Sequence, residues 1–174
     1  NLNKYPNATC NDGTAAGFYH SFTPQTTPKT KTIIHLEGGG WCYNKETSKK
    51  RNATAPTLMS SKYQEESLII SDGLMSDSSW RGSNSSGSLL HVNRVYVKYC
   101  SSDGYFGSSG PPPTIADDSS SGFVFNGNHI INSIIDILVN DYQILGENGT
   151  SILLSGSSAG GRGAMAHLDS VHSL

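Results

Sequence analysis

A serine between closely spaced glycines, placed where an apolar strand turns into a helix, is the feature that most constrains this chain. Residues 151–155 predict an apolar strand, and residues 164–171 predict the start of a helix. Between them, Gly156 to Gly160 fits the pattern G-x-S-x-G, in which small residues let the chain turn sharply. The residue at the tip of such a turn has a strained backbone, and its hydroxyl points out of the sheet. Ser158 is therefore the candidate nucleophile.

Two neighbouring hydroxyls compete with Ser158 for this role. Ser155 and Ser157 lie in the same segment, but only Ser158 has a glycine two positions away on each side. The helix after the turn would bring backbone N–H groups and a positive dipole end beside that serine. The alternative is a plain turn, since the chain has 19 glycines and such patterns arise by chance.

The other predicted elements alternate between strands and helices. Strands are predicted at residues 31–37 and 92–99, a helix at 128–142, and short helical pieces around 55–66. A long Gly/Ser/Pro loop is predicted at 101–121. This alternation predicts an α/β protein with a mostly parallel sheet and helices on both faces. No linker divides the 174 residues, so one domain is expected.

A run of three glycines follows the first predicted strand. Gly38 to Gly40 lie upstream of the candidate nucleophile, where backbone N–H groups free of side chains can approach a developing oxyanion. Glu37, at the strand end beside the glycines, is interpreted as a carboxylate that fixes the loop rather than as a catalytic acid. His35, inside the strand, is interpreted as a core or edge histidine rather than the catalytic base.

Composition excludes several classes of protein. The net charge of −2 gives no electrostatic support for nucleic-acid binding, and no apolar run reaches the length of a membrane span. Charged residues are only 15% of the chain, which suits a secreted or secretory-lumen protein, and we expect the sequence to be a mature form. No metal or cofactor is expected, because the cysteines and His20, His91 and His129 lack ligand spacing.

Six ordered stretches resemble the pectin acetylesterase and Notum family of carboxylesterases. The resemblance covers nearly the whole chain, in the stretches Cys10-Asn-Asp-Gly-Thr-Ala-Ala-Gly-Phe-Tyr19, Ile34-His-Leu-Glu-Gly-Gly-Gly-Trp-Cys-Tyr-Asn44, Leu58-Met-Ser-Ser61, Tyr99-Cys-Ser-Ser-Asp103, Phe125-Asn-Gly127 and Leu154-Ser-Gly-Ser-Ser-Ala-Gly-Gly161. It implies an α/β-hydrolase fold with Ser158 as nucleophile. The backbone N–H groups of Gly39, Gly40 and Ala159 would form the oxyanion hole.

The resemblance also implies that part of the domain is missing. In this family the catalytic Asp and His follow the nucleophile at a distance, and only sixteen residues follow Ser158 here. His167, Asp169 and His172 should lie on the helix that leaves the turn, too far along it to reach Ser158. We therefore expect residues 1–174 to be the N-terminal portion of one α/β-hydrolase domain. A second polypeptide or a C-terminal segment would supply the Asp and the His.

The resemblance predicts how the three cysteines behave. A disulfide is expected between Cys10 and Cys100, which leaves Cys42 free or joined to something outside the chain. Family members usually carry a second cysteine six positions after Cys42, where this sequence has Ser48. Glycosylation sequons occur in polar stretches predicted to be turns, at Asn7, Asn52, Asn84 and Asn148.

These expectations combine into one predicted activity and two alternatives. The predicted protein is a secreted serine carboxylesterase that removes an O-acyl group, most plausibly acetyl, from a polysaccharide or glycoconjugate. The first alternative is a Notum-like deacylase of a lipid-modified protein. The second is a non-catalytic structural or binding glycoprotein that keeps the fold.

Overall fold

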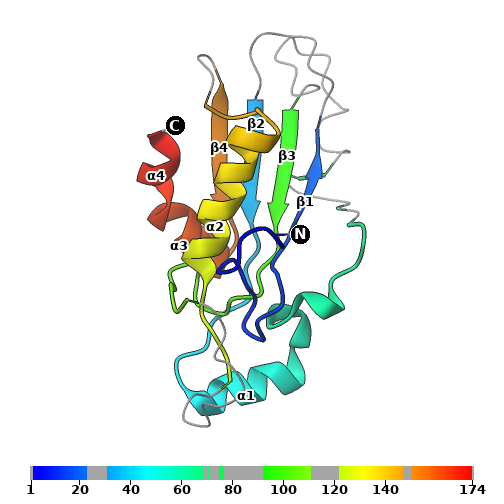
Figure 1. Cartoon of the computed structure of the whole chain (residues 1–174), viewed down its shortest axis with the longest axis vertical. Helices are drawn as coiled ribbons and strands as arrows, with labels where there is room; N and C mark the ends of the chain where they lie inside the picture. Colours follow the sequence, from blue (N-terminus) through cyan, green and yellow to red (C-terminus); the bar gives the residue numbers. More distant parts are fainter. Residues whose placement is uncertain are drawn as a thin grey trace.

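A four-stranded sheet is the centre of the computed structural model, which describes residues 2–22, 31–68, 70, 75–76, 92–110, 122–146 and 150–173 (Figure 1). The strand order is β1-β3-β2-β4, and β1 is antiparallel to β3 while the other pairs are parallel. The strands are β1 (Phe18–Ser21), β2 (Lys31–Leu36), β3 (Val92–Val97) and β4 (Ser151–Gly156). This mixed, mostly parallel sheet confirms the predicted α/β class.

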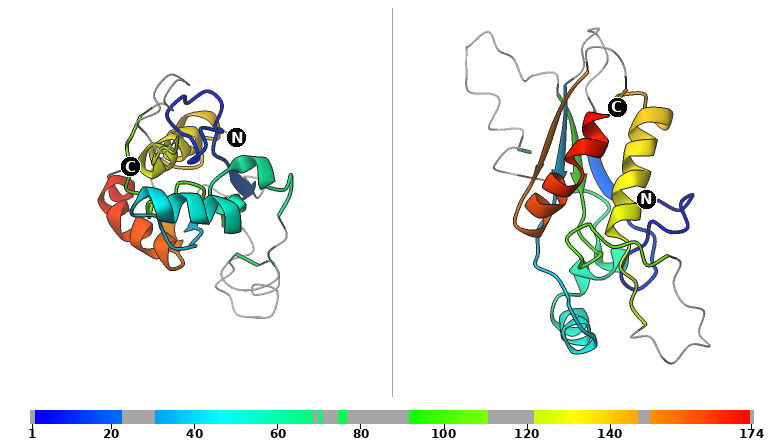
Figure 2. Two further views of the ribbon diagram at one scale, coloured as in Figure 1. Left: turned by 90° about the horizontal axis from the view of Figure 1, so that it is seen from below. Right: turned by 90° about the vertical axis from the view of Figure 1, so that its left-hand side faces the viewer.

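Helices flank the sheet and close its lower end. They are α1 (Lys45–Thr54), α2 (Gly127–Asp136), which continues as a π-helical turn (Ile137–Asp141), α3 (Ala159–Ala166) and α4 (Leu168–His172). Two 3₁₀ turns, Pro56–Leu58 and Ser61–Tyr63, follow α1. Figure 2 shows α2, α3 and α4 on the same side of the sheet, with α1 across the end toward which β2 and β3 run.

The main core lies between the sheet and α2. Ile34 and Val95 from the strands join Ile130, Ile134 and Leu138 in one buried cluster. A smaller cluster on the opposite face contains Ile33, Val92 and Met75. Helices were predicted on both faces, but the described helices beside the sheet cover one face. The two crossovers run in opposite directions across the sheet, so right-handed connections put them on opposite faces. Only the β3-to-β4 crossover has a described helix over the sheet.

Several predicted boundaries differ from the structure. The strands end at Leu36 and Val97, before the predicted residues 37 and 99. The helix predicted from residues 164–171 is divided between two helices, because the backbone turns at His167 between α3 and α4. The short strand β1 and the helix α1 were not predicted.

Helix α1 escaped prediction because it has no apolar face. Its sequence KETSKKRNAT is polar throughout, and only Ser48 is buried. The helix begins instead with a capping box, in which the side chains of Asn44 and Thr47 each accept a hydrogen bond from the other residue's backbone N–H. The predicted helical pieces around 55–66 are confirmed as the two 3₁₀ turns.

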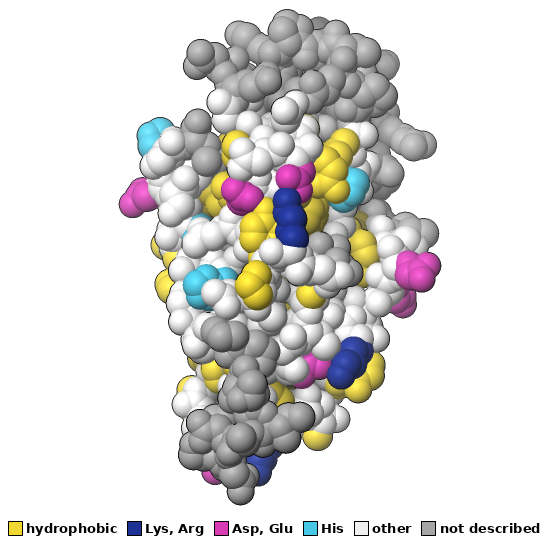
Figure 3. Space-filling view, viewed as in Figure 1, with side chains coloured by type: hydrophobic (Ala, Val, Ile, Leu, Met, Phe, Trp, Pro, Cys, Tyr) yellow, Lys and Arg dark blue, Asp and Glu magenta, His cyan; other side chains and the backbone are white. Residues whose placement is uncertain are grey.

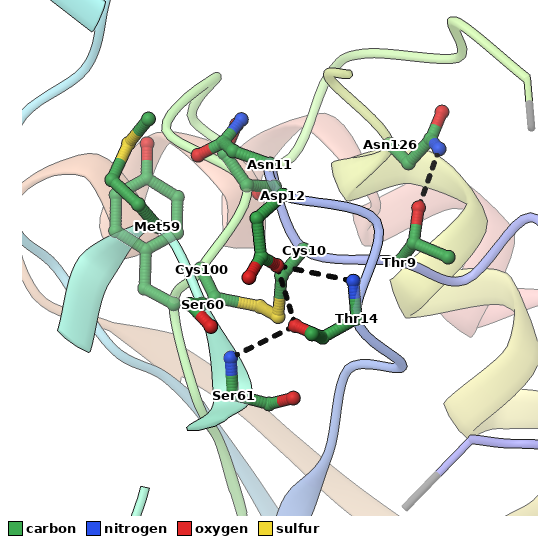
Figure 4. Close-up of a disulfide and its surroundings, with 12 residues drawn as sticks. Thr9, Cys10, Asn11, Asp12, Thr14, Met59, Ser60, Ser61, Cys100 and Asn126 are labelled. Atoms are coloured by element: carbon green, nitrogen blue, oxygen red, sulfur yellow. Dashed lines mark hydrogen bonds between the residues drawn. A yellow bond between two sulfur atoms is a disulfide. The ribbon is translucent and has the colours of Figure 1, made fainter. Parts of the chain in front are cut away.

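A disulfide between Cys10 and Cys100 joins the N-terminal segment to the chain after β3, as predicted (Figure 4). Nearby, Asp12 accepts hydrogen bonds from the backbone and hydroxyl of Thr14, and Ser61 donates to Thr14 Oγ1 at 3.1 Å. Cys42 is a free, half-buried thiol. These contacts fix the N-terminal segment against the carboxyl end of β3.

The sequons fall in different surroundings. Asn7 lies in a half-buried turn, whereas Asn52 is exposed on α1, which corrects the prediction that every sequon lies in a turn. Asn84 and Asn148 lie outside the described residues.

The surface is polar but carries few charges on the face seen in Figure 3, where charged side chains are scattered singly or in small groups. This distribution agrees with the low charged fraction of the sequence. In the part of the chain that the structure covers, no helix is long and apolar enough to cross a bilayer.

Candidate active site

The turn from β4 into α3 holds Ser158 in a backbone conformation that L-residues rarely adopt. Its φ is 49° and its ψ is −114°. The turn closes because Gly156 and Gly160 have no side chains: a Cβ on Gly156 would lie 2.2 Å from the carbonyl oxygen of Gly160. A Cβ on Gly160 would lie 2.0 Å from the carbonyl oxygen of Leu36. The predicted sharp turn is therefore present, and its glycines are required by close backbone contact.

The glycine run after β2 lies against this turn. The register pairs Leu36 with Gly156, so β2 and β4 end at the same level and their loops meet. The backbone N–H of Ser157 donates to the carbonyl of Leu36 at 3.1 Å, and the N–H of Gly38 donates to Ser157 Oγ at 3.1 Å. Gly39 and Gly40 have φ values of +148° and +72°. The fold thus brings the two predicted motifs together.

The hydroxyls of the three competing serines differ in their partners. Ser157 Oγ accepts the hydrogen bond from Gly38, and Ser155 Oγ lies 3.0 Å from His35 Nδ1. Ser158 is exposed, and its hydroxyl has no hydrogen-bond partner among the residues described. Of the three, only Ser158 combines the strained backbone with a hydroxyl free to react.

The proposed oxyanion-hole amides are also unengaged. The N–H groups of Gly39, Gly40 and Ala159 donate to no acceptor within the described ranges. Ala159 is the first residue of α3, so its N–H has no acceptor inside the helix. These amides belong to the two loops that meet at Ser157. Gly39 and Gly40 are half-buried, and Ala159 is fully buried.

Glu37 fixes the end of β2, as predicted. Its carboxylate accepts from Lys98 Nζ at 2.6 Å and from the backbone N–H of Tyr99 at 2.8 Å. Its backbone N–H donates to Val97 at 3.1 Å, and its carbonyl accepts from the Tyr105 hydroxyl at 3.0 Å. With every polar group engaged in the scaffold, Glu37 holds the glycine loop in place.

His35 is a packed strand residue. Its ring stacks on that of Tyr96 at 5.6 Å between centroids. Burial lowers the pKa of His35, although nearby Glu37 opposes the shift. Burial and the charge of Glu37 raise the pKa of Tyr96 to about 12. Both shifts favour the neutral forms of the two side chains, and the pair packs the sheet.

No described histidine or carboxylate bonds to Ser158. His167 is only 5% exposed, and its Nε2 lies 2.8 Å from the carbonyl oxygen of Tyr105. Asp169 and His172 lie exposed on α4. This agrees with the expectation that none of the three activates Ser158. Within the described ranges, no group of three His, Cys, Asp or Glu side chains could hold a metal ion.

Sequence reasoning missed a set of side chains around the glycine loop. Arg51 donates from Nε to Ser102 Oγ at 2.8 Å, and Arg162 lies over the ring of Trp41 at 4.5 Å. An aromatic hollow of about 470 Å³ adjoins the loop, lined in part by Trp41, Tyr43 and Phe106. These residues come from separate segments, so no local pattern could have revealed them.

The strand, the strained serine turn and the following helix, with the glycine loop beside them, form the strand–turn–helix arrangement of an α/β-hydrolase-like fold. The profile of the pectinacetylesterase family matches residues 2–174. The chain belongs to this family.

Curated relatives are similar over almost the whole chain. It is 34% identical over 166 residues to palmitoleoyl-protein carboxylesterase notum1a of Danio rerio, covering 95% of this chain and 30% of that protein. It is 35% identical over 170 residues to notum2 of Xenopus laevis, with the same coverage. The chain therefore spans about a third of the length of these relatives.

A solved structure agrees with the sequence relatives. The Wnt deacylase Notum from Drosophila superposes with a TM-score of 0.79 at 30% identity, over 96% of this chain and 45% of that one. The match extends the resemblance from sequence motifs to the three-dimensional fold.

Proposed function

We propose that this chain carries the nucleophile and oxyanion hole of a secreted serine carboxylesterase. The observation that carries the proposal is the exposed hydroxyl of Ser158, which has no hydrogen-bond partner among the described residues and lies on a strained turn that adjoins a glycine loop. Strain of this kind persists only where the surrounding structure enforces it, and here backbone contacts at Gly156 and Gly160 do so.

The proposed chemistry is acyl transfer to water. Ser158 Oγ attacks the ester carbonyl, and the amides of Gly39, Gly40 and Ala159 stabilise the resulting oxyanion. The alcohol leaves after protonation, and water then hydrolyses the acyl-enzyme and returns the proton to the serine. Both acyl-transfer steps need a group near Ser158 that takes the proton from the attacking oxygen and gives it to the leaving oxygen. We propose that the Asp and His come from a C-terminal segment or a second polypeptide beyond these 174 residues.

The exposed edge of β4 is the proposed place for that missing part. Within the described sheet, β4 pairs only with β2, and Leu153 on β4 is 49% exposed. A bare apolar edge is an aggregation hazard, so a further strand beside β4 would stabilise the sheet. It would also continue the sheet on the side where Ser158 lies.

The proposed substrate is an ester with a small acyl group, such as an O-acetyl group on a polysaccharide or glycoconjugate. The family name supports this choice. A second candidate is an acylated protein, because the curated relatives are named palmitoleoyl-protein carboxylesterases. The aromatic hollow beside the glycine loop would suit the longer, apolar acyl chain of such a substrate.

A fluorophosphonate probe tests the activity in the intact native protein. We expect covalent labelling at Ser158 and none in a Ser158→Ala variant that folds normally, with ester turnover reduced at least about 10³-fold. Ser157→Ala is the matched comparison and should keep labelling. It removes the hydrogen bond that Gly38 donates to Ser157 Oγ, so turnover should fall, but far less than in Ser158→Ala. An unlabelled wild-type protein would favour the non-catalytic scaffold.

A series of nitrophenyl esters separates the two substrate classes. Turnover that is highest for acetate and falls with chain length supports the small-acyl assignment. Turnover that rises toward long acyl chains supports the deacylase alternative, because each buried methylene adds roughly 0.8 kcal/mol of binding.

A further inference from the structure

The segment from Gly39 to Trp41 is held by the backbone at its two ends only. Gly38 donates to Ser157 Oγ at 3.1 Å, and Cys42 donates to the carbonyl of Ser102 at 2.8 Å. Between these anchors, no backbone N–H of Gly39, Gly40 or Trp41 has an acceptor among the described residues. Glycines at positive φ have wide conformational freedom, so something besides the backbone must restrict them.

Trp41 supplies a side chain through which this segment can be held. It follows Gly40 directly, and its ring lies 4.5 Å from the guanidinium carbon of Arg162. Arg162 belongs to the first turn of α3, and its backbone N–H donates to the carbonyl of Ser158 at 3.2 Å. One residue therefore contacts both the nucleophile turn and the glycine loop.

Among the described residues, the arginine has no competing ionic partner. No carboxylate there lies within ion-pair distance of Arg162, and its guanidinium donates no hydrogen bond to a described residue, so no other polar interaction competes with the ring of Trp41. A planar guanidinium stacks on an indole face in a way that a lysine ammonium does not. The geometry suits a non-covalent contact that links α3 to the glycine loop. The contact between Arg162 and Trp41 is here called the clasp.

We propose that Arg162 is a positioning residue that holds the Gly39–Gly40 amides against Ser158 through its contact with Trp41. The inference deepens the proposed function, because it treats that loop as the oxyanion hole. Arg162 does not touch the reacting atoms and acts through Trp41.

Hydrogen–deuterium exchange of the peptide covering residues 38–43, in the intact protein, tests the clasp without reference to activity. We expect Arg162→Ala to speed exchange of this peptide about two- to fivefold, the range set by an exposed cation–π contact. Arg162→Lys should restore part of the protection. Met165→Ala, on the same helix and 80% exposed, is the matched control and should leave this peptide unchanged.

Steady-state kinetics then test whether Arg162 positions the Gly39 and Gly40 amides. With nitrophenyl acetate, whose short acyl group does not need the aromatic hollow that Trp41 lines, Arg162→Ala should lower kcat by about two- to fivefold with KM little changed. With the same substrate, adding Trp41→Ala should cause little further loss. Unchanged exchange in Arg162→Ala, or additive losses in the double variant, would overturn the inference. If wild-type protein neither labels at Ser158 nor turns over esters, the proposed function fails. The exchange measurement then decides the clasp alone.

Discussion

Two loops at the carboxyl end of the sheet hold non-glycine residues at positive φ. The side chains of these strained residues are exposed in one loop and buried in the other. The turn from β4 into α3 leaves the hydroxyl of Ser158 exposed and without a partner among the described residues. The second loop, residues 101–107, here called the Asp103 loop, holds Ser102 at φ 51° and Tyr105 at φ 68°. Both of those side chains are fully buried.

The Asp103 loop offsets its strain with hydrogen bonds. The hydroxyl of Ser102 donates to the carbonyl of Leu58 at 3.0 Å and accepts from Arg51. Asp103 accepts from the hydroxyl of Ser101 and from three backbone N–H groups, those of Tyr105, Gly107 and Gly127, at 2.7–3.0 Å. Strain with all groups satisfied belongs to a scaffold, whereas strain beside a free hydroxyl indicates a site of chemistry.

The largest expected effect on stability comes from the disulfide that anchors the Asp103 loop. The bond closes a loop with a sequence separation of 90 residues. In the chain-entropy model, the double variant Cys10→Ser, Cys100→Ser should lower the free energy of unfolding by about 4 kcal/mol. Denaturant unfolding of the oxidised wild-type protein and of the double variant measures this difference. A loss below about 1 kcal/mol would mean that the loop is held by its hydrogen bonds alone.

A smaller loss is expected when the acceptor at the centre of the loop is removed. Asp103→Ala leaves three backbone N–H groups and a buried hydroxyl without their acceptor, so we expect the free energy of unfolding to fall by about 3 kcal/mol. Asp169→Ala, an exposed carboxylate on α4, is the control and should change it by less than about 1 kcal/mol. Equal losses of unfolding free energy in the two variants would mean that Asp103 stabilises the protein no more than an exposed carboxylate does.

The smallest expected change in the free energy of unfolding is an increase rather than a decrease. It gives the most direct comparison of the two loops. Ser158→Gly relieves the positive φ and breaks no hydrogen bond of the side chain, so it should raise the free energy of unfolding by about 1 kcal/mol while abolishing ester turnover. Ser102→Gly also relieves a positive φ but loses two buried hydrogen bonds, and should destabilise the protein. If both variants shift stability the same way, strain does not distinguish the two loops.

Local pattern predicted the parts of the site that depend on neighbours in sequence. The G-x-S-x-G spacing pointed to Ser158, and the glycine run after β2 pointed to residues 38–40 as an oxyanion-hole loop. The choice of Gly39 and Gly40 within that run came from the family resemblance. Such motifs can be recognised in the sequence because a sharp turn or a close approach of two backbones requires glycine. The pairing of Cys10 with Cys100 was predicted from family resemblance.

Other features were decided by contacts between segments distant in the sequence. Helix α1 has no apolar periodicity, yet it forms and places Arg51 beside the glycine loop. The break between α3 and α4 occurs at His167, whose Nε2 lies 2.8 Å from the carbonyl oxygen of Tyr105, 62 residues away in the sequence. No hydrophobic period encodes either contact.

The sequence by itself determined that a strained serine and a glycine run exist, because each is a local backbone requirement. Only the tertiary structure decided that they meet. The parallel register of β2 and β4 brings Leu36 level with Gly156, so the loops that follow the two strands meet and the N–H of Gly38 donates to Ser157 Oγ. Register depends on the packing of whole strands against a shared core, which no local stretch of residues specifies.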